Sequence, residues 1–93
     1  MTYRVLADPR VVEDLQEAID YYEAEQKGLA QYFGEQIEQA FLTLERNPFF
    51  QIRYDNVRCL PIKKFPYMFH FTINESTKTI HIRALINTYK NII

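Results

Sequence analysis

The chain has 93 residues, of which 47% are hydrophobic and 15% aromatic, so it has the size of one domain whose core must contain large rings. A formal net charge of −1 and a pI near 6.1 exclude a strongly basic nucleic-acid-binding domain. Its single cysteine, Cys59, excludes an internal disulfide and a multi-cysteine metal cage. Without a signal peptide or a membrane-length apolar run, the sequence predicts a cytoplasmic protein.

The chain begins with a predicted strand and a helix start. Residues 3–6 alternate between apolar and polar types, which is typical of a short strand. Asp8 can then cap a helix, because Pro9 suits the first helical position, where no backbone N–H is needed.

Two helices are predicted next. Apolar residues recur at helical spacing over residues 11–22 and again over residues 29–44. The pattern is interrupted at Gln26-Lys27-Gly28 and ends at Asn47-Pro48. So short a break predicts an antiparallel helical hairpin.

After Pro48 the apolar period changes to the two-residue alternation of strands. Residues 49–54 fit a loop or a short strand equally well. Residues 57–63 are predicted to be extended, and Pro61 within them is suited to an edge strand or a bulge. Two further strands follow around a turn at residues 74–77. The sequence therefore predicts one α+β domain over residues 1–93, ordered β-α-α-β-β-β, with a helical hairpin packed on one face of a small antiparallel sheet.

The last two predicted strands place polar side chains on the sheet face without helices. The apolar rows that should face the helices are Tyr67, Phe69, Phe71 and Ile73 on one strand and Ile80, Ile82, Ala84 and Ile86 on the other. This register puts Met68, His70 and Thr72 beside His81 and Arg83 on the open face. The two histidines and the arginine could bind phosphate or transfer protons, or could simply be the polar surface of a half-exposed sheet. Two histidines with no third ligand give little support to a metal site.

The charges are unevenly distributed along the chain. Residues 13–45 are mostly acidic and residues 46–90 mostly basic, so an anionic partner should meet the sheet layer. Arg58, Lys63 and Lys64 could hold a phosphate backbone or an acidic protein segment, or could be the charged edge that keeps a strand from aggregating. The sequence does not determine on which side of the sheet Arg58 lies. In a regular strand Leu60 points to the same side as Arg58, and Leu60 should be buried.

Several short motifs, in this order and spacing, resemble the RelE/ParE superfamily of bacterial type II toxin–antitoxin toxins. They span nearly the whole chain: Tyr3-Arg4-Val5, Asp8-Pro9, Asp14-Leu15, Ala18-Ile19-Asp20-Tyr21-Tyr22, Leu44-Glu45-Arg46-Asn47-Pro48, Val57-Arg58-Cys59-Leu60 and Phe65-Pro66-Tyr67-Met68-Phe69-His70-Phe71. The resemblance implies the same fold and a growth-inhibiting toxin neutralised by a cognate antitoxin protein in a hetero-oligomer, with no cofactor. The antitoxin is expected on the outer groove of the helical hairpin and on the basic sheet face.

Two activities occur in that superfamily: ParE-like members poison DNA gyrase, and RelE-like members cleave messenger RNA on the ribosome. Lys63 matches a basic residue of the RNA-cleaving members, but Met68 stands where several of them carry arginine and Asn87 where a histidine or basic residue is frequent. The resemblance therefore favours a gyrase-directed or catalytically weak toxin. The alternatives are a ribosome-dependent endoribonuclease and an inactive antitoxin-binding module. The candidate catalytic residues are Arg58, Lys63, His70, His81, Arg83 and Tyr89, and the candidate binding residues are Arg58, Lys63, Lys64, Tyr67 and Lys90.

Overall fold

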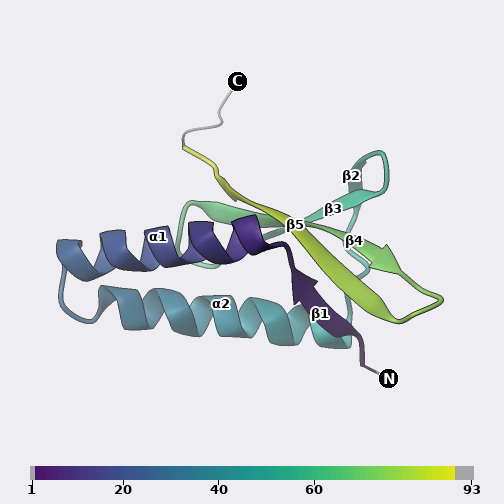
Figure 1. The fold of residues 1–93 in the computed structure, drawn as a ribbon, viewed down its shortest axis with the longest axis horizontal. Coiled ribbons are helices and arrows are strands. Elements are labelled where there is room, and N and C mark those ends of the chain that lie inside the picture. Colours follow the sequence, from purple (N-terminus) through teal and green to yellow (C-terminus); the bar gives the residue numbers. More distant parts are fainter. Residues whose placement is uncertain (1, 90–93) are drawn as a thin grey trace.

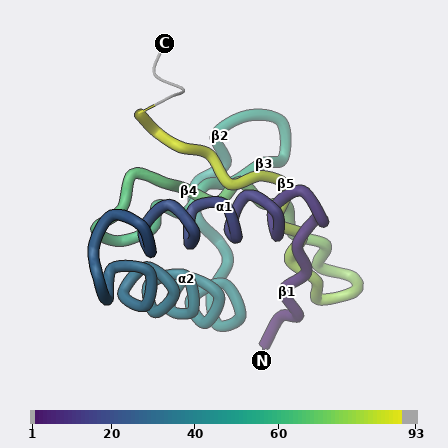
Figure 2. The backbone as a smooth tube through the Cα atoms, turned by 60° about the vertical axis from the view of Figure 1, so that its left-hand side comes forward, coloured from purple at the N-terminus to yellow at the C-terminus, as the bar shows by residue number. Residues whose placement is uncertain are grey.

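The computed structural model describes residues 2–89, which form two helices and five strands (Figure 1). Neither helix in this range is long and apolar enough to cross a membrane. In chain order the elements are β1 Arg4–Ala7, α1 Pro9–Glu25, α2 Leu29–Arg46, β2 Ile52–Tyr54, β3 Val57–Pro61, β4 Tyr67–Asn74 and β5 Thr79–Asn87. The predicted α+β fold is confirmed: α1 and α2 pair as a hairpin on one side of the sheet (Figures 1 and 2).

The helix boundaries follow the predicted signals, with one exception. Pro9 begins α1, and the connection to α2 passes through Gly28, whose φ of 85° lies in the left-handed region that glycine tolerates best. Asp8 occupies the N-cap position, but its side chain makes no capping hydrogen bond. The predicted cap is wrong because the Asp8 carboxylate accepts a hydrogen bond from His81 instead.

The sheet has the order β1-β5-β4-β3-β2. Its strand pairs are antiparallel except one: β1 runs parallel to β5, with Arg4 opposite Thr79, which differs from the fully antiparallel sheet expected. The open alternative for residues 49–54 is resolved, since Ile52–Tyr54 forms the three-residue edge strand β2. Pro61 is the last residue of β3, and its missing N–H does not prevent the next residue from pairing, because Ile62 N–H donates to the Tyr67 carbonyl at 2.8 Å.

A β-bulge in β5 changes which residues face the helices. Phe71 lies opposite Ile82, but the next residue of β4, His70, lies opposite Ala84, so Arg83 is an extra residue. After the bulge, even-numbered residues of β5 face the open side and odd-numbered residues face the helices. Leu85 is therefore buried, while Ala84 shares the open face with His70. The expectation that Ala84 and Ile86 face the helices is therefore wrong.

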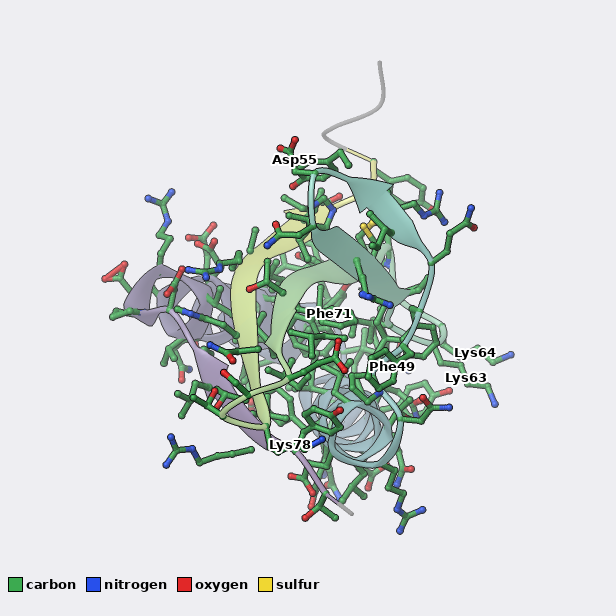
Figure 3. The ribbon with its side chains drawn as sticks, turned by 90° about the vertical axis from the view of Figure 1, so that its right-hand side faces the viewer. Phe49, Asp55, Lys63, Lys64, Phe71 and Lys78 are labelled. Atoms are coloured by element: carbon green, nitrogen blue, oxygen red, sulfur yellow. The ribbon has the colours of Figure 1, made fainter. Side chains whose placement is uncertain are left out.

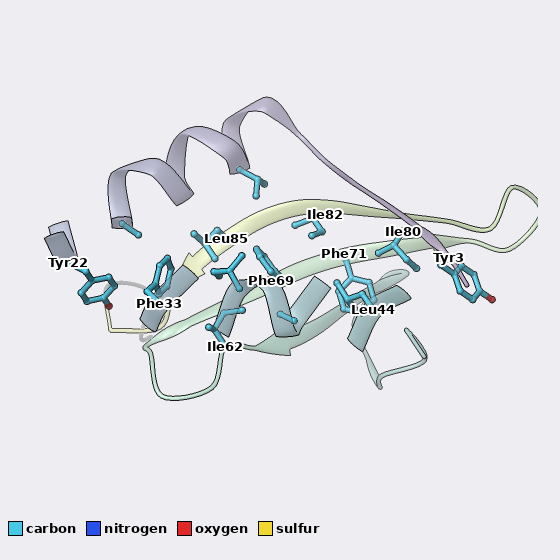
Figure 4. Close-up of a cluster of buried hydrophobic side chains, with 14 residues drawn as sticks. Tyr3, Tyr22, Phe33, Leu44, Ile62, Phe69, Phe71, Ile80, Ile82 and Leu85 are labelled. Atoms are coloured by element: carbon cyan, nitrogen blue, oxygen red, sulfur yellow. The ribbon is translucent and has the colours of Figure 1, made fainter. Parts of the chain in front are cut away.

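The core lies between the helices and the sheet (Figure 4). Phe33, Phe69 and Phe71 are fully buried, and the ring of Phe69 stacks on that of Phe41 at 5.6 Å between centroids. Each such ring removes about 150–250 Å² from water, so these aromatic side chains supply a large part of the stabilisation of a domain this small.

Candidate functional site

A depression of about 660 Å³ lies on the open face of the sheet, where β1, β4 and β5 meet the β4–β5 turn. Its walls include Arg4, Thr72, His81 and Arg83. The bulge leaves Arg83 as an extra residue of β5 beside this hollow, and Arg83 Nε donates a hydrogen bond to Thr72 Oγ1 at 3.2 Å. The predicted grouping of Thr72, His81 and Arg83 on the open face is thus observed.

His81 is fixed by an acidic partner from the other end of the chain. Its Nε2 is hydrogen-bonded to a carboxylate oxygen of Asp8, and both side chains are about one-third exposed. This contact joins the β1–α1 junction to β5. It also occupies one of the two imidazole nitrogens, so only Nδ1 of His81 is left for any other ligand.

His70 has a different hydrogen-bond partner from His81. Its Nδ1 is hydrogen-bonded to the Tyr54 hydroxyl at 3.0 Å, and Cys59 lies opposite it on β3. Burial lowers the pKa of His70 below its usual 6.5, so the imidazole is neutral at pH 7. Burial raises the pKa of the Cys59 thiol, although Arg53 partly opposes this shift. Cys59 is therefore a buried thiol rather than a reactive thiolate.

Arg58 points toward the helix-bearing side of the sheet, which settles the alternative that the sequence left open. It lies opposite the fully buried Phe71. Its Nη1 donates to the Phe50 carbonyl at 2.9 Å, and its guanidinium lies 5.3 Å from the centre of the Phe49 ring. Arg58 thus holds the segment that follows α2, and it is on the opposite face from Arg83.

Lys63 and Lys64 lie in the β3–β4 turn and extend from one side of the molecule (Figure 3). Lys64 adopts a φ of 72°, a left-handed conformation in which a side chain is strained by about 1 kcal/mol. It borders a second hollow, of about 880 Å³, between α1 and the ends of β4 and β5.

The walls of this second hollow combine aromatic rings with the charged side chains of Arg10, Asp14, Glu17 and Lys64. They include Tyr21, Tyr22, Phe65, Tyr67 and Tyr89. Tyr67 is half-buried, with its ring 5.7 Å from that of Phe33, whereas Tyr21 and Tyr89 are 57% and 75% exposed. We call this site the aromatic hollow. The sequence offered one signal for it: Tyr21 lies off the apolar stripe of its helix. Lys90, the remaining candidate, lies outside the described residues.

The candidate residues do not converge on one centre. Arg58 lies on the helix-bearing side of the sheet, whereas His81 and Arg83 line the depression on the open face. The depression contains His81 and Arg83, the aromatic hollow contains Lys64, Tyr67 and Tyr89, and neither is lined by His70. Within residues 2–89, no three His, Cys, Asp or Glu side chains are grouped as metal ligands.

Comparison with known proteins identifies the family. The family model described as "ParE toxin of type II toxin-antitoxin system, parDE" matches residues 5–90. A solved chain from the "Chromosomal ParDE TA system from P. aeruginosa" has the same fold, with a TM-score of 0.73 and 19% sequence identity, covering 91% of this chain and 95% of that chain. No curated protein matches the sequence significantly. The resemblance in the sequence is confirmed, and the chain belongs to the ParE toxin family of type II toxin–antitoxin systems.

Proposed function

We propose that this toxin inhibits growth by binding DNA gyrase rather than by cutting RNA. A toxin of this family has a cognate antitoxin partner, and the antitoxin neutralises it. Gyrase as the target is our proposal, and the arrangement of the candidate residues supports it.

The observation that supports this proposal is that the two candidate histidines and Arg58 do not line one common site. Cleavage of RNA by its own 2′-OH needs a base, an acid and a cation within hydrogen-bond reach of one phosphate. Here His81 shares the depression with Arg83 but is hydrogen-bonded to Asp8. His70, the second titratable candidate, lines neither hollow and is hydrogen-bonded to Tyr54, and Arg58 is on the other side of the sheet. A neutral imidazole such as that of His70 can accept a proton, but its side-chain hydrogen bond is to Tyr54 and not to a described lysine or arginine.

The side chains at two further positions also favour binding over RNA cleavage. Met68 lies on the open face opposite Ile86, and its thioether carries no charge with which to stabilise a phosphorane. Asn87, the last residue of β5, carries an amide that does not titrate near neutral pH. The two positions where RNA-cleaving relatives place charged or titrating groups are therefore both uncharged here.

Two assays on the same purified protein test the proposal. In the first, gyrase acts on plasmid DNA with and without the toxin. In the second, ribosomes translate a defined transcript. We expect gyrase inhibition with an intact transcript, and we expect the His70→Ala/His81→Ala double variant to inhibit gyrase as well as the wild type does. Ribosome-dependent cleavage that disappears in the double variant would instead establish the nuclease alternative, and inactivity in both assays would support an inert antitoxin-binding module.

We further propose that an amphipathic, acidic segment of the antitoxin docks in the aromatic hollow. The exposed aromatic rings suit apolar side chains of such a partner, and Lys64, which also lines the hollow, suits an acidic one. Tyr21 is the test residue, and Val12 is the control because it is 56% exposed on the same helix but does not line the hollow. Tyr21→Ser should weaken antitoxin binding about tenfold, as expected for an aromatic anchor, and Val12→Ser should leave it unchanged. Equal effects of both variants would contradict this docking site.

The sequence predicted antitoxin docking on the basic sheet face, which requires Arg58, Lys63 and Arg83 to lie on one side of the sheet. This prediction needs revision, because Arg58 and Arg83 lie on opposite faces of the sheet. An antitoxin segment in the aromatic hollow meets Lys64 without reaching either arginine. Arg58→Glu should therefore act on the antitoxin complex only through the stability of the toxin itself.

A further inference from the structure

We propose that the depression on the open face of the sheet is a phosphate-binding site, able to hold a phosphate monoester or diester through Arg4, Arg83 and Thr72. This site lies away from the aromatic hollow, and it does not depend on the choice of gyrase as target.

Two arginines from different strands border this depression. Arg4 is on β1 opposite Thr79, and Arg83 is the extra residue of the bulge in β5. Both are exposed, and among residues 2–89 neither forms an ion pair with a carboxylate. Guanidinium groups present planar pairs of N–H donors that match the oxygens of a phosphate, so two of them bordering one hollow form the basis of an oxyanion site.

The β-bulge and a hydrogen bond to Thr72 restrain the position of Arg83. The bulge places an additional side chain on the open face, and bulges frequently re-aim a side chain in this way. The hydrogen bond from Nε to Thr72 Oγ1 restrains the guanidinium but leaves its two terminal nitrogens available. Because Thr72 Oγ1 accepts that bond, the hydroxyl proton of Thr72 can point to a ligand oxygen as a third donor.

The charged side chains that line the depression favour an anion, and one of them, Glu75, offers a test of anion binding. Glu75, at the β4–β5 turn, is the one carboxylate among the lining residues, and among residues 2–89 it forms no ion pair with Arg4 or Arg83. Asp8 is bound to His81, whose imidazole also borders the hollow. Two cations thus face one unpaired carboxylate, and removal of Glu75's charge should strengthen the binding of any anion here.

The test is a titration followed by two-dimensional amide NMR at constant ionic strength, with chloride as the reference anion. One arm uses inorganic phosphate and the other a short single-stranded oligodeoxynucleotide, which distinguishes a free phosphate from the backbone of a nucleic acid. The variants are Arg4→Gln/Arg83→Gln and Glu75→Gln. Lys27→Gln is the control, because it removes one exposed positive charge in the helical hairpin, far from the depression. Amide spectra of the free variants verify that each is folded.

In the wild type we expect saturable shifts at residues 72–83 in at least one arm. The double arginine variant should bind at least tenfold more weakly, Glu75→Gln a few-fold more tightly, and Lys27→Gln as the wild type does, since each charge-assisted contact contributes about a factor of ten or more. Saturation only with the oligonucleotide identifies a nucleic-acid backbone as the source of the phosphate. Shifts that are spread over all basic residues, or that are unchanged in the double variant, would overturn the proposal.

Discussion

Replacing Arg58 by alanine should destabilise the fold before it affects any partner. Arg58 was a candidate for phosphate or partner contact, yet its guanidinium donates to the Phe50 carbonyl and lies over the Phe49 ring. Both partners belong to the segment between α2 and β2. Without Arg58, this segment loses its connection to β3, and a half-buried carbonyl loses its donor.

The size of the loss can be worked out from these two contacts. A hydrogen bond from a charged donor contributes about 1.5–3 kcal/mol, and a cation–π contact at a partly exposed site adds about 0.5–1 kcal/mol. Solvent screening of a half-exposed side chain favours the lower ends, which gives about 2 kcal/mol in total. For a domain below 100 residues, that loss lowers the melting temperature by roughly 8–16 °C.

The assay is urea and thermal unfolding of Arg58→Ala and Arg58→Lys, followed by far-UV circular dichroism. Arg53→Ala is the matched control, since Arg53 is an exposed arginine on the adjacent β2. Lysine keeps the charge but lacks the planar fork, so Arg58→Lys should recover only part of the stability. A loss below about 0.5 kcal/mol in Arg58→Ala, similar to that of Arg53→Ala, would refute the structural role.

Three further outcomes can be measured on the same protein. Phe71→Ala should lower the unfolding free energy by about 3–5 kcal/mol and leave the chain largely unfolded, because Phe71 is completely buried. Tyr21→Ala, at an exposed position, should change the unfolding free energy by less than about 0.5 kcal/mol. A Phe71→Ala variant that is folded and unfolds cooperatively would contradict this view of the core. The folded state lowers the pKa of His70, so its contribution to stability is complete above the usual pKa of 6.5 and is lost as the pH falls below that value. His70→Gln should therefore flatten the fall in unfolding free energy between pH 7.5 and 5 (pH values chosen to bracket that pKa), and an unchanged slope would count against it. The raised pKa and burial of Cys59 predict slow reaction with a thiol reagent in the native protein and fast reaction in urea, so equal rates would show that the thiol is accessible.

Local sequence signals predicted the helical hairpin and the strands well, because each depends on nearby residues. The break at Gly28 and the end of the second helical pattern at Asn47-Pro48 are turn and stop signals with local causes. Pairing across the sheet was harder to predict. The apolar alternation of β5 continues without a visible break through Arg83, so the bulge that turns Leu85 inward leaves no mark in the pattern.

The sequence predicted which face of the sheet several candidate side chains share, but not their hydrogen-bond partners. The alternation correctly placed His70, His81 and Arg83 on one face, but it could not show that Tyr54 and Asp8 each hold one of the histidines. Those partners come from segments far away in the sequence, and a polar residue such as Asp8 offers several local hydrogen-bonding alternatives. Only the three-dimensional structure determines which alternative is used.

The parallel pairing of β1 with β5 determines when the domain can finish folding. The two paired strands lie far apart in the sequence, so β1 can find its place only after β5 has been synthesised. Closing so large a loop is entropically costly and slows assembly relative to the helical hairpin, which needs only neighbouring residues. A nascent toxin that lacks its last strand therefore has no sheet position for its first one. Completion of the fold is thus coupled to the synthesis of β5.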